Sequence, residues 1–329
     1  QTAKNVFAQE THTFSANAIN VARFAYNDSN IYYSTTGTGS QDFVTQFGIE
    51  NLNPASSQFA PPAVTLSTHT GLGNPTSPQG ALQRLYEFAD DITLTRGNHT
   101  ISIGGELDKL DFNGNWTIWN NGQFSFNGQY TSNHQGSLSG GSDLADFLLG
   151  FPSSAEGGTG VTVANFRQWN VQPYIQDDWR VSHRLTLNVG LRYDYYGSPD
   201  DANHHSNVYD VATNTNHSGT FHQTYLNFAP RVGLAYSLDD KTAVHAGYGI
   251  YYTPFQYNQL QFLMINEPNF FLQLNTYSLN TPTPVTNTFA ANPTLSAEAP
   301  FTIQLNMKTP YVQQWNLAGE RSLGRQWLA

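Results

Sequence analysis

The chain reads QWNVQPYIQDDWRVSHRLTLNVGLRYDY from Gln168 to Tyr195, and this stretch decides the fold class. Apolar and polar side chains alternate on both sides of Ser182-His183. Because successive strand side chains point to opposite faces, this period of two predicts a β-hairpin with one apolar face. Its strands exceed the usual length of about five or six residues, as is typical of a sheet that faces lipid. The apolar positions are Trp169, Val171, Pro173, Ile175, Trp179 and Val181 before the turn, and Leu185, Leu187, Val189, Leu191, Tyr193 and Tyr195 after it.

The overall composition narrows the class of protein. Only 12% of the 329 residues are charged and 14% are aromatic, whereas charged residues make up about a quarter of an average soluble protein. Mean hydropathy is −0.44, and the sequence has no apolar run of about 18 residues, which excludes membrane-spanning helices. A transmembrane β-barrel fits because its strands average an apolar and a polar face. A secreted all-β protein rich in Asn, Gly, Ser and Thr fits the composition equally well.

Charge and cysteine content exclude several kinds of site. The net charge of −10 gives nucleic-acid binding no electrostatic support. The chain has no cysteine, which excludes disulfides and thiolate metal sites and suits a protein that crosses an oxidising periplasm. The glycine-rich stretches lack the Lys-Ser/Thr of a phosphate-binding loop. We expect no cofactor.

The same alternation recurs along the chain. It is clearest in residues 85–107, 226–252 and 311–323, with a weaker strand at 14–28. Short turns alternate strictly with long polar segments, as they do in outer-membrane barrels with short periplasmic turns and longer extracellular loops. A sandwich or jelly roll has no reason to place all its short turns at one end. The long segments are 29–81, 113–162, 198–223 and 254–308.

These features predict an all-β fold, an antiparallel up-and-down transmembrane β-barrel with long extracellular loops. About eight strands are present, and a ninth begins near Arg325. An open sheet edge cannot persist in hydrocarbon. We therefore expect a partial barrel, about eight to nine strands of a larger one, with residues 1–329 belonging to one outer-membrane barrel domain. Gln1–Asn5 show no charged-then-apolar signal segment, and no plug domain is expected in this stretch.

Several motifs in a fixed order carry a family resemblance. The most specific is YIQDDWR at 174–180, which continues to LTLNVGLRYD at 185–194. From about residue 10 onward, the chain resembles the β-barrel region of TonB-dependent outer-membrane transporters of the Oar-like type. The other motifs are YEFADD at 86–91, ADFLLGFP at 145–152, NFAPRVG at 227–233, GYGIYY at 247–252 and TPYVQQWNL at 309–317.

The resemblance implies a place in the outer membrane of a Gram-negative-type bacterium, in contact with outer-membrane lipid. In such transporters a barrel of about 22 strands surrounds a plug, and a TonB-type energy-coupling system drives them from the inner membrane. We expect neither the plug, the TonB box nor the closing strands in this sequence, so this stretch alone should not perform energised transport. The implied function is uptake of an unknown bulky solute, or surface signalling.

Two sets of candidate functional residues follow. Polar residues on alternate strand positions should face the barrel lumen, where they would line its wall or meet the plug. This set is Arg180, Asn188, Arg192 and Arg231. Residues in the long segments should contact a ligand, because aromatic rings stack on sugars or apolar groups. This second set is Trp116, Trp119, His204 and His205.

The histidines in 198–223 also offer ligands for a transition metal. Their spacing matches no compact ligand motif, however, and neighbouring histidines in a polar loop are commonly just solvated. No metal site is predicted.

The acidic pairs Asp90-Asp91 and Asp177-Asp178 lie near strand ends. Paired carboxylates can perform acid–base catalysis, but adjacent strand residues point to opposite faces and cannot converge on one substrate atom. We expect these carboxylates to anchor the membrane interface and to match the lumenal arginines 180, 192 and 231. No enzymatic activity is predicted.

Three parts of the long segments have expected structures. Alternation at 124–130 predicts a strand that extends above the membrane. Residues 142–150 predict a short helix, capped by Ser142 and ended by Gly150, with its apolar face on the barrel wall. The apolar segment 255–271 is expected to pack within its own loop, with the barrel mouth or a partner as alternatives.

Two other function classes remain open from the sequence. One is a secreted or surface β-rich binding or adhesion protein without a transport role, which solubility without detergent would favour. The other is a secreted β-rich hydrolase, for which the chain shows no convergent acid–base pair.

Overall fold

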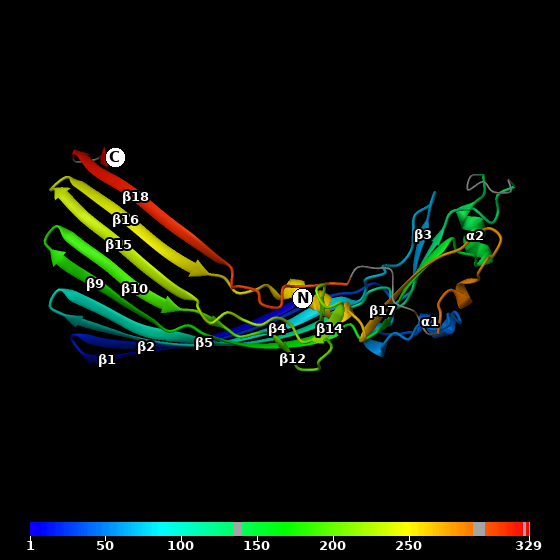
Figure 1. Ribbon diagram of the computed structural model, residues 1–329, viewed down its shortest axis with the longest axis horizontal. Coiled ribbons are helices and arrows are strands. Elements are labelled where there is room, and N and C mark those ends of the chain that lie inside the picture. The colour runs from blue at the N-terminus through cyan, green and yellow to red at the C-terminus, as the bar shows by residue number, and fades with distance from the viewer. Residues whose placement is uncertain (134–139, 292–299, 325–326, 329) are drawn as a thin grey trace.

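The computed structural model describes residues 1–133, 140–291, 300–324 and 327–328, and its main feature is one large antiparallel sheet (Figure 1). Short turns join the strands at one end, the turn end, and four long segments join them at the other, the loop end (Figure 1). The strands across this sheet are β1 (Thr2–Ser15), β2 (Ala18–Tyr33), β4 (Gln79–Arg96), β5 (His99–Trp116), β8 (Val163–Val171) with β9 (Tyr174–Ser182), β10 (Leu185–Tyr193), β15 (Phe228–Asp239), β16 (Thr242–Tyr252), β18 (Tyr311–Gly324) and β19 (Trp327–Leu328).

The hairpin predicted at 168–195 is confirmed, and its first strand is longer than the sequence suggested. Strands β8 and β9 both pair with β5 in one unbroken register. The ladder is interrupted only at Pro173, which has no N–H to donate, while Gln172 and Glu106 exchange both backbone hydrogen bonds (2.9 and 3.3 Å). One strand therefore continues from Val163 to Ser182.

Two tryptophans on this strand mark a membrane band. Trp169 and Trp179 share its apolar face and lie ten positions apart, and a transmembrane strand needs about 9–11 residues. The Lys109 ammonium lies 5.9 Å from the Trp169 ring centroid, and the His99 ring stacks on Trp179 at 5.3 Å. Aromatic rings beside polar groups at both ends of an apolar stretch are typical of the two membrane interfaces.

The apolar face of the sheet is exposed between these interfaces. Ile175 is 50% and Leu191 44% exposed, and large exposed apolar surfaces mark contact with a partner or with lipid. Cross-strand aromatic pairs form a girdle toward the loop end. They are Tyr26–Tyr86, Tyr193–Phe228 and Tyr252–Tyr311, with ring centroids 5.0, 5.1 and 5.7 Å apart. The fold is a partial transmembrane β-barrel.

Across the described residues, no helix has both the length and the apolar character needed to span a membrane.

The long segments fold into a second, four-stranded sheet at the loop end (Figure 1). Three of the four segments contribute strands to it, in the order β17 (Phe270–Thr276), β7 (Ser154–Gly160), β6 (Gln123–Phe126) and β3 (Ala63–Leu66). Of the strand expected at 124–130, only the first part is present, as β6; it ends at Phe126, residues 128–130 turn instead, and β6 belongs to this separate sheet. Two further short strands of the large sheet pair with β8, and they are β11 (Tyr195–Tyr196) and β12 (Asp200–Asp201). The remaining elements are α1 (Phe43–Gln46), η1 (Ser56–Gln58), α2 (Asp143–Leu149), β13 (Asn207–Asp210), β14 (Thr215–Ser218), α3 (Tyr257–Leu260), η2 (Gln261–Ile265) and η3 (Val285–Asn287).

The hydrophobic core lies at the loop end. One cluster joins the second sheet to α1, with Phe124 and Phe289 among its buried members. Another packs Leu260, Leu263 and Met264 against the loop ends of β5 and β8. The expectation that the segment 255–271 packs within its own loop is therefore wrong, and the alternative of contact with the barrel mouth agrees with the structure. These buried contacts make the long segments a folded layer.

The helix predicted at 142–150 is present as α2, with Ser142 as its N-cap and Gly150 in the left-handed conformation. The expectation that it packs on the barrel wall is wrong, because its Phe147 ring packs against Phe126 of the second sheet. The Asp143 carboxylate joins α2 to the first long segment by accepting hydrogen bonds from the Thr68 N–H and hydroxyl. Burial acts to raise the pKa of Asp143, but these hydrogen bonds and His69 hold it well below its usual range.

The two acidic pairs have structural partners, as expected, and each pair is split between the two faces of its strand. The partners differ from the expected arginines 180, 192 and 231, because register brings other polar groups opposite each carboxylate. In the first pair, Asp90 accepts a hydrogen bond from Asn20 Nδ2 (2.6 Å), and Asp91 accepts hydrogen bonds from Arg23 and the Tyr174 hydroxyl. In the second pair, Asp178 accepts a hydrogen bond from Asn188, and Asp177 Oδ2 lies 2.7 Å from His99 Nδ1.

The start of the chain departs from the expectation of one weak strand at 14–28. The structure has a hairpin there, with β1 paired to β2 from Thr2↔Asn30 to Ser15↔Ala18. The side chains of β1 are exposed throughout. Because most of its residues are polar, its sequence shows no alternation of apolar and polar positions that would have predicted a strand.

Leu191→Arg should destabilise insertion by about 2–4 kcal/mol, the cost of an arginine on the lipid face near the middle of the bilayer. The matched Asn188→Arg lies on the polar face and keeps a donor for Asp178. We expect folded, heat-modifiable protein in outer-membrane fractions to fall for the first variant only. Equal amounts of both variants would contradict the lipid-facing assignment.

Candidate functional site

An aromatic pocket of about 520 Å³ lies among the long segments. All four segments contribute to its wall, since Thr76 comes from the first, Trp119 from the second, Tyr209 from the third and Phe262 from the fourth. Pockets that hold small ligands have volumes of about 300–1,000 Å³ and mainly apolar walls. The full lining is Thr76, Trp116, Ile118, Trp119, Tyr209, Asn214, Asn216, Phe262, Ile265, Asn266, Glu267, Phe270, Leu272, Pro300 and Phe301.

The two tryptophans expected to contact a ligand both line this pocket. Trp116 ends β5 and meets the Phe262 ring edge-on at 5.7 Å. Trp119 has a positive φ of 49°, which is uncommon for a bulky residue and is retained only where surrounding contacts impose it. Its N–H donates to Pro75 O (2.9 Å), and its carbonyl accepts from Gly158 (3.0 Å). The backbone of Trp119 is thus fixed from both sides.

Asn266 connects two of the segments that form the pocket. Its side-chain Nδ2 donates to Asn207 O (2.7 Å) and to Phe301 O (2.6 Å), and its Oδ1 accepts from the Phe301 N–H (2.9 Å). The residue is only 3% exposed. A buried amide with these partners holds the pocket wall in one arrangement.

The histidine pair lies outside the aromatic pocket. His205 Nδ1 donates to Val163 O (3.0 Å), and its backbone N–H donates to the buried Asp201 carboxylate (3.0 Å). His204 has a left-handed φ of 55° in the same turn. The structure therefore gives His205 an anchoring role in its loop, and a ligand contact by either histidine stays a prediction.

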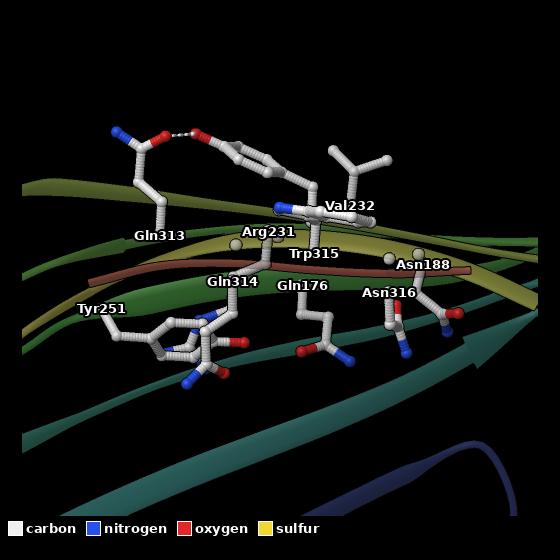
Figure 2. A pocket seen from close by; sticks show the side chains of 14 residues that line it. Gln176, Asn188, Arg231, Val232, Tyr251, Gln313, Gln314, Trp315 and Asn316 are labelled. Atoms are coloured by element: carbon white, nitrogen blue, oxygen red, sulfur yellow. Dashed lines mark hydrogen bonds between the residues drawn. The ribbon is translucent and has the colours of Figure 1, made fainter. Parts of the chain in front are cut away.

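The polar face of the sheet has a shallow hollow of about 550 Å³, which we call the glycine hollow. Figure 2 shows Asn188, Arg231 and Gln314 on this face, whereas Val232 and Trp315 extend from the opposite one. The floor contains Gly190, Gly233, Gly247 and Gly249. A Cβ at Gly247 would lie 2.6 Å from Asn316 Oδ1, so glycine lets that amide lie flat on the wall. The other polar-face residues of the rim are Gln176, Tyr251 and Asn316 (Figure 2).

The four polar-strand residues singled out from sequence are not gathered in one place. Asn188 and Arg231 line the glycine hollow, where the Arg231 guanidinium lies 4.7 Å from the Tyr251 ring centroid. Arg192 lies nearer the loop end and pairs with Asp194 (2.7 Å). Arg180 is exposed near the short turn. Their contact with a lumenal solute or a plug remains a prediction.

Three carboxylates form a further cluster on the same polar face. Glu87, Glu106 and Asp108 bring ligand oxygens within 4.8 Å of one another. Oxygen donors of this kind suit hard cations such as Ca²⁺. Gln172 joins the cluster to Arg192, since its Nε2 donates to Asp108 (3.1 Å) and its Oε1 accepts from the guanidinium.

The family model described as "Outer membrane beta barrel domain" matches residues 1–329. The chain belongs to this family. It is a protein of the bacterial outer membrane, so the loop end is extracellular and the turn end is periplasmic. No curated protein matches the chain.

One solved structure agrees on the fold. The chain is similar to the outer-membrane transporter YddB from Escherichia coli, with 12% identity and a TM-score of 0.50 over 98% of this chain and 32% of that one. It also matches a mutant of the ferric enterobactin receptor PfeA from Pseudomonas aeruginosa, with 12% identity and a TM-score of 0.40 over 78% of this chain and 26% of that one. The chain thus spans about a third or less of these structures.

Sequence reasoning found the tryptophans of the aromatic pocket and missed the residues opposite them. Tyr209, Phe262 and Phe301 come from distant segments, and only the folded loop end places them beside Trp119. The apolar composition of 255–271 was the one signal available. The glycines of the glycine hollow are visible in the sequence, but strand register decides that they adjoin.

Asn266→Ala should destabilise the pocket wall by about 1–3 kcal/mol, because it leaves buried backbone groups of Asn207 and Phe301 without partners. Hydrogen exchange of full-length protein should speed up at 207–218 and 300–303 while the transmembrane strands stay protected. Gln259→Ala, on the exposed side of α3, is the control. Unchanged exchange in the Asn266 variant would show that this amide does not hold the wall.

Proposed function

We propose that the chain forms the wall and the extracellular entrance of a TonB-dependent-type receptor for a bulky solute. The solute is captured in the aromatic pocket and then passes along the polar face of the barrel. A plug domain, moved by an energy-coupling system at the inner membrane, opens this path. The observation that carries the proposal is the pocket itself, since all four long segments meet around it.

The walls of the pocket support a binding role. Phe262 and Phe301 stack at 5.0 Å with an interplanar angle of 14°, and Trp116 meets the same Phe262 ring. Fixed aromatic rings give a large contact area at low entropic cost. Asn214 and Asn216 on the β13–β14 hairpin add carboxamides that can orient a ligand through hydrogen bonds.

The polar face of the sheet supports passage of a solute along the barrel wall. Its glycine hollow is bordered by the amide side chains of Gln176, Asn188, Gln314 and Asn316, beside the guanidinium of Arg231. Amides donate and accept hydrogen bonds without carrying charge. A solute or a plug segment can therefore exchange hydrogen bonds with this wall while remaining hydrated. The similarity to outer-membrane transporters supports the same reading.

Trp119→Ala should weaken capture by about 2 kcal/mol or more, about thirtyfold in affinity, because tryptophans dominate binding where they fill a pocket. We would compare depletion of solutes from growth medium by cells that carry the wild-type receptor, the Trp119 variant or Leu148→Ala. Leu148 is an exposed residue of α2 outside the pocket. Depletion of at least one solute should require Trp119 and not Leu148.

The same assay in cells without the energy-coupling system separates transport from surface binding. Loss of depletion there supports energised uptake. Depletion that persists without energy coupling contradicts the TonB-dependent part, and binding to cells without internalisation favours a surface adhesion or binding role. If no solute differs between the wild-type and Trp119 variant cells, the proposed capture site is wrong.

A further inference from the structure

The negative charge of the protein is concentrated in its extracellular segments. These are residues 34–78, 117–162, 194–227 and 253–310, the stretches between the long strands. Among the 38 charged residues of the chain, they contain eleven carboxylates and a single cation, Lys308, whereas the strands and short turns contain thirteen of each sign. The formal charge of these four stretches is therefore −10 and that of the remaining residues is zero, although Asp194 lies at a strand end and pairs with Arg192 (2.7 Å). The eleven are Asp42, Glu50, Asp143, Asp146, Glu156, Asp194, Asp200, Asp201, Asp210, Glu267 and Glu298.

The aromatic pocket also has an excess of negative over positive side chains. Its lining contains no lysine, arginine or histidine, and its one charged side chain is Glu267. Glu267 is partly buried at the pocket wall. Within the described part of the chain, no hydrogen bond or ion pair engages its carboxylate. A partly buried carboxylate without a partner attracts a cation and repels an anion more strongly than a fully solvated one.

The aromatic rings act in the same direction. Tryptophan, tyrosine and phenylalanine present negative ring faces that attract a cation within about 6 Å. Six of the lining residues carry such rings, and these are Trp116, Trp119, Tyr209, Phe262, Phe270 and Phe301. Aromatic walls with one carboxylate suit a ligand that has an apolar body and an ammonium or guanidinium group.

We infer that the aromatic pocket selects an organic cation with an apolar body, and that the extracellular segments select against anions. The inference deepens the proposed capture function and rests on it. The segments raise the concentration of cations near the entrance and lower that of anions, over a distance of about 8 Å at physiological salt. Glu267 and the rings then discriminate inside the pocket. An anionic iron chelate would meet unfavourable charge at both stages.

Three probes with one ring system and different charge test this inference. They are 1-naphthylmethylammonium, 1-naphthylmethanol and 1-naphthoate, titrated calorimetrically against the purified full-length receptor in detergent. The heat measured with the Trp119→Ala variant is subtracted from that of the wild-type receptor. This subtraction removes the contribution of probe that dissolves in the detergent micelle and leaves only binding that depends on Trp119. We expect the cation to bind at least about tenfold more tightly than the anion at low salt, and the gap to narrow at 0.5 M salt, as expected of screened charges.

Glu267→Gln should reduce the preference for the cation over the neutral probe by about tenfold. Glu50→Gln removes one charge from the same face but outside the pocket, where Glu50 accepts from Asn287 (3.2 Å), and it should leave this preference nearly unchanged. The salt dependence needs no variant, so it tests the inference even if Glu267→Gln folds poorly.

The possible outcomes distinguish failure of the charge-selection inference from failure of the proposed capture function. Trp119-dependent binding that is equal for all three probes, or strongest for the anion, overturns charge selection and leaves the pocket as a capture site. Absence of Trp119-dependent binding for every probe contradicts the capture site itself. Equal effects of the two glutamate substitutions would assign the selection to the whole face and overturn the role of Glu267.

Discussion

Backbone hydrogen bonding in hydrocarbon is the constraint on which the rest of this structure depends. A strand that crosses a membrane has no water to satisfy its N–H and C=O groups, so neighbouring strands must pair along its whole membrane length. The unbroken register of β8 and β9 along β5 meets this demand. Pro173 removes only one donor, and the Tyr193 N–H still donates to the Pro173 carbonyl at 3.0 Å. Side chains are then free to alternate between lipid and lumen.

The same constraint restricts the hydrophobic core to the loop end of the molecule. The membrane part of the sheet exposes an apolar face to lipid and has polar side chains on its other face, so only the loop ends of its strands, with Phe112 and Phe166, join a buried cluster. The buried clusters otherwise lie in the extracellular layer, where Phe124, Leu263 and Phe270 are almost completely covered. A packed layer keeps the aromatic pocket in shape, which mobile loops would not do. The barrel strands therefore hold the extracellular layer in place, and the extracellular layer forms the pocket proposed to recognise a ligand.

Much of the transmembrane architecture follows from local pattern. Alternation around Ser182-His183 predicted a hairpin, its two faces and the plan of short turns and long segments. The pattern failed for β1, because its exposed residues are mostly polar, and it did not place Phe124 and Phe126 in a second sheet. Trp116 and Trp119 were identified as surface aromatics in a loop. Their opposite walls could not be identified, because contacts between distant segments leave no periodic trace in the sequence.

The sequence by itself determined the fold class, which positions share the apolar and the polar face of the sheet, and the location of the short turns. It did so because strand alternation is a local property that each residue pair carries. Tertiary structure alone decided which segments meet at the loop end, that Asn266 fixes Asn207 to Phe301, and that Glu267 lines the same pocket as six aromatic residues. These contacts join parts of the chain that are far apart in sequence, and they form only when packing in the extracellular layer repays the entropy of ordering four long segments.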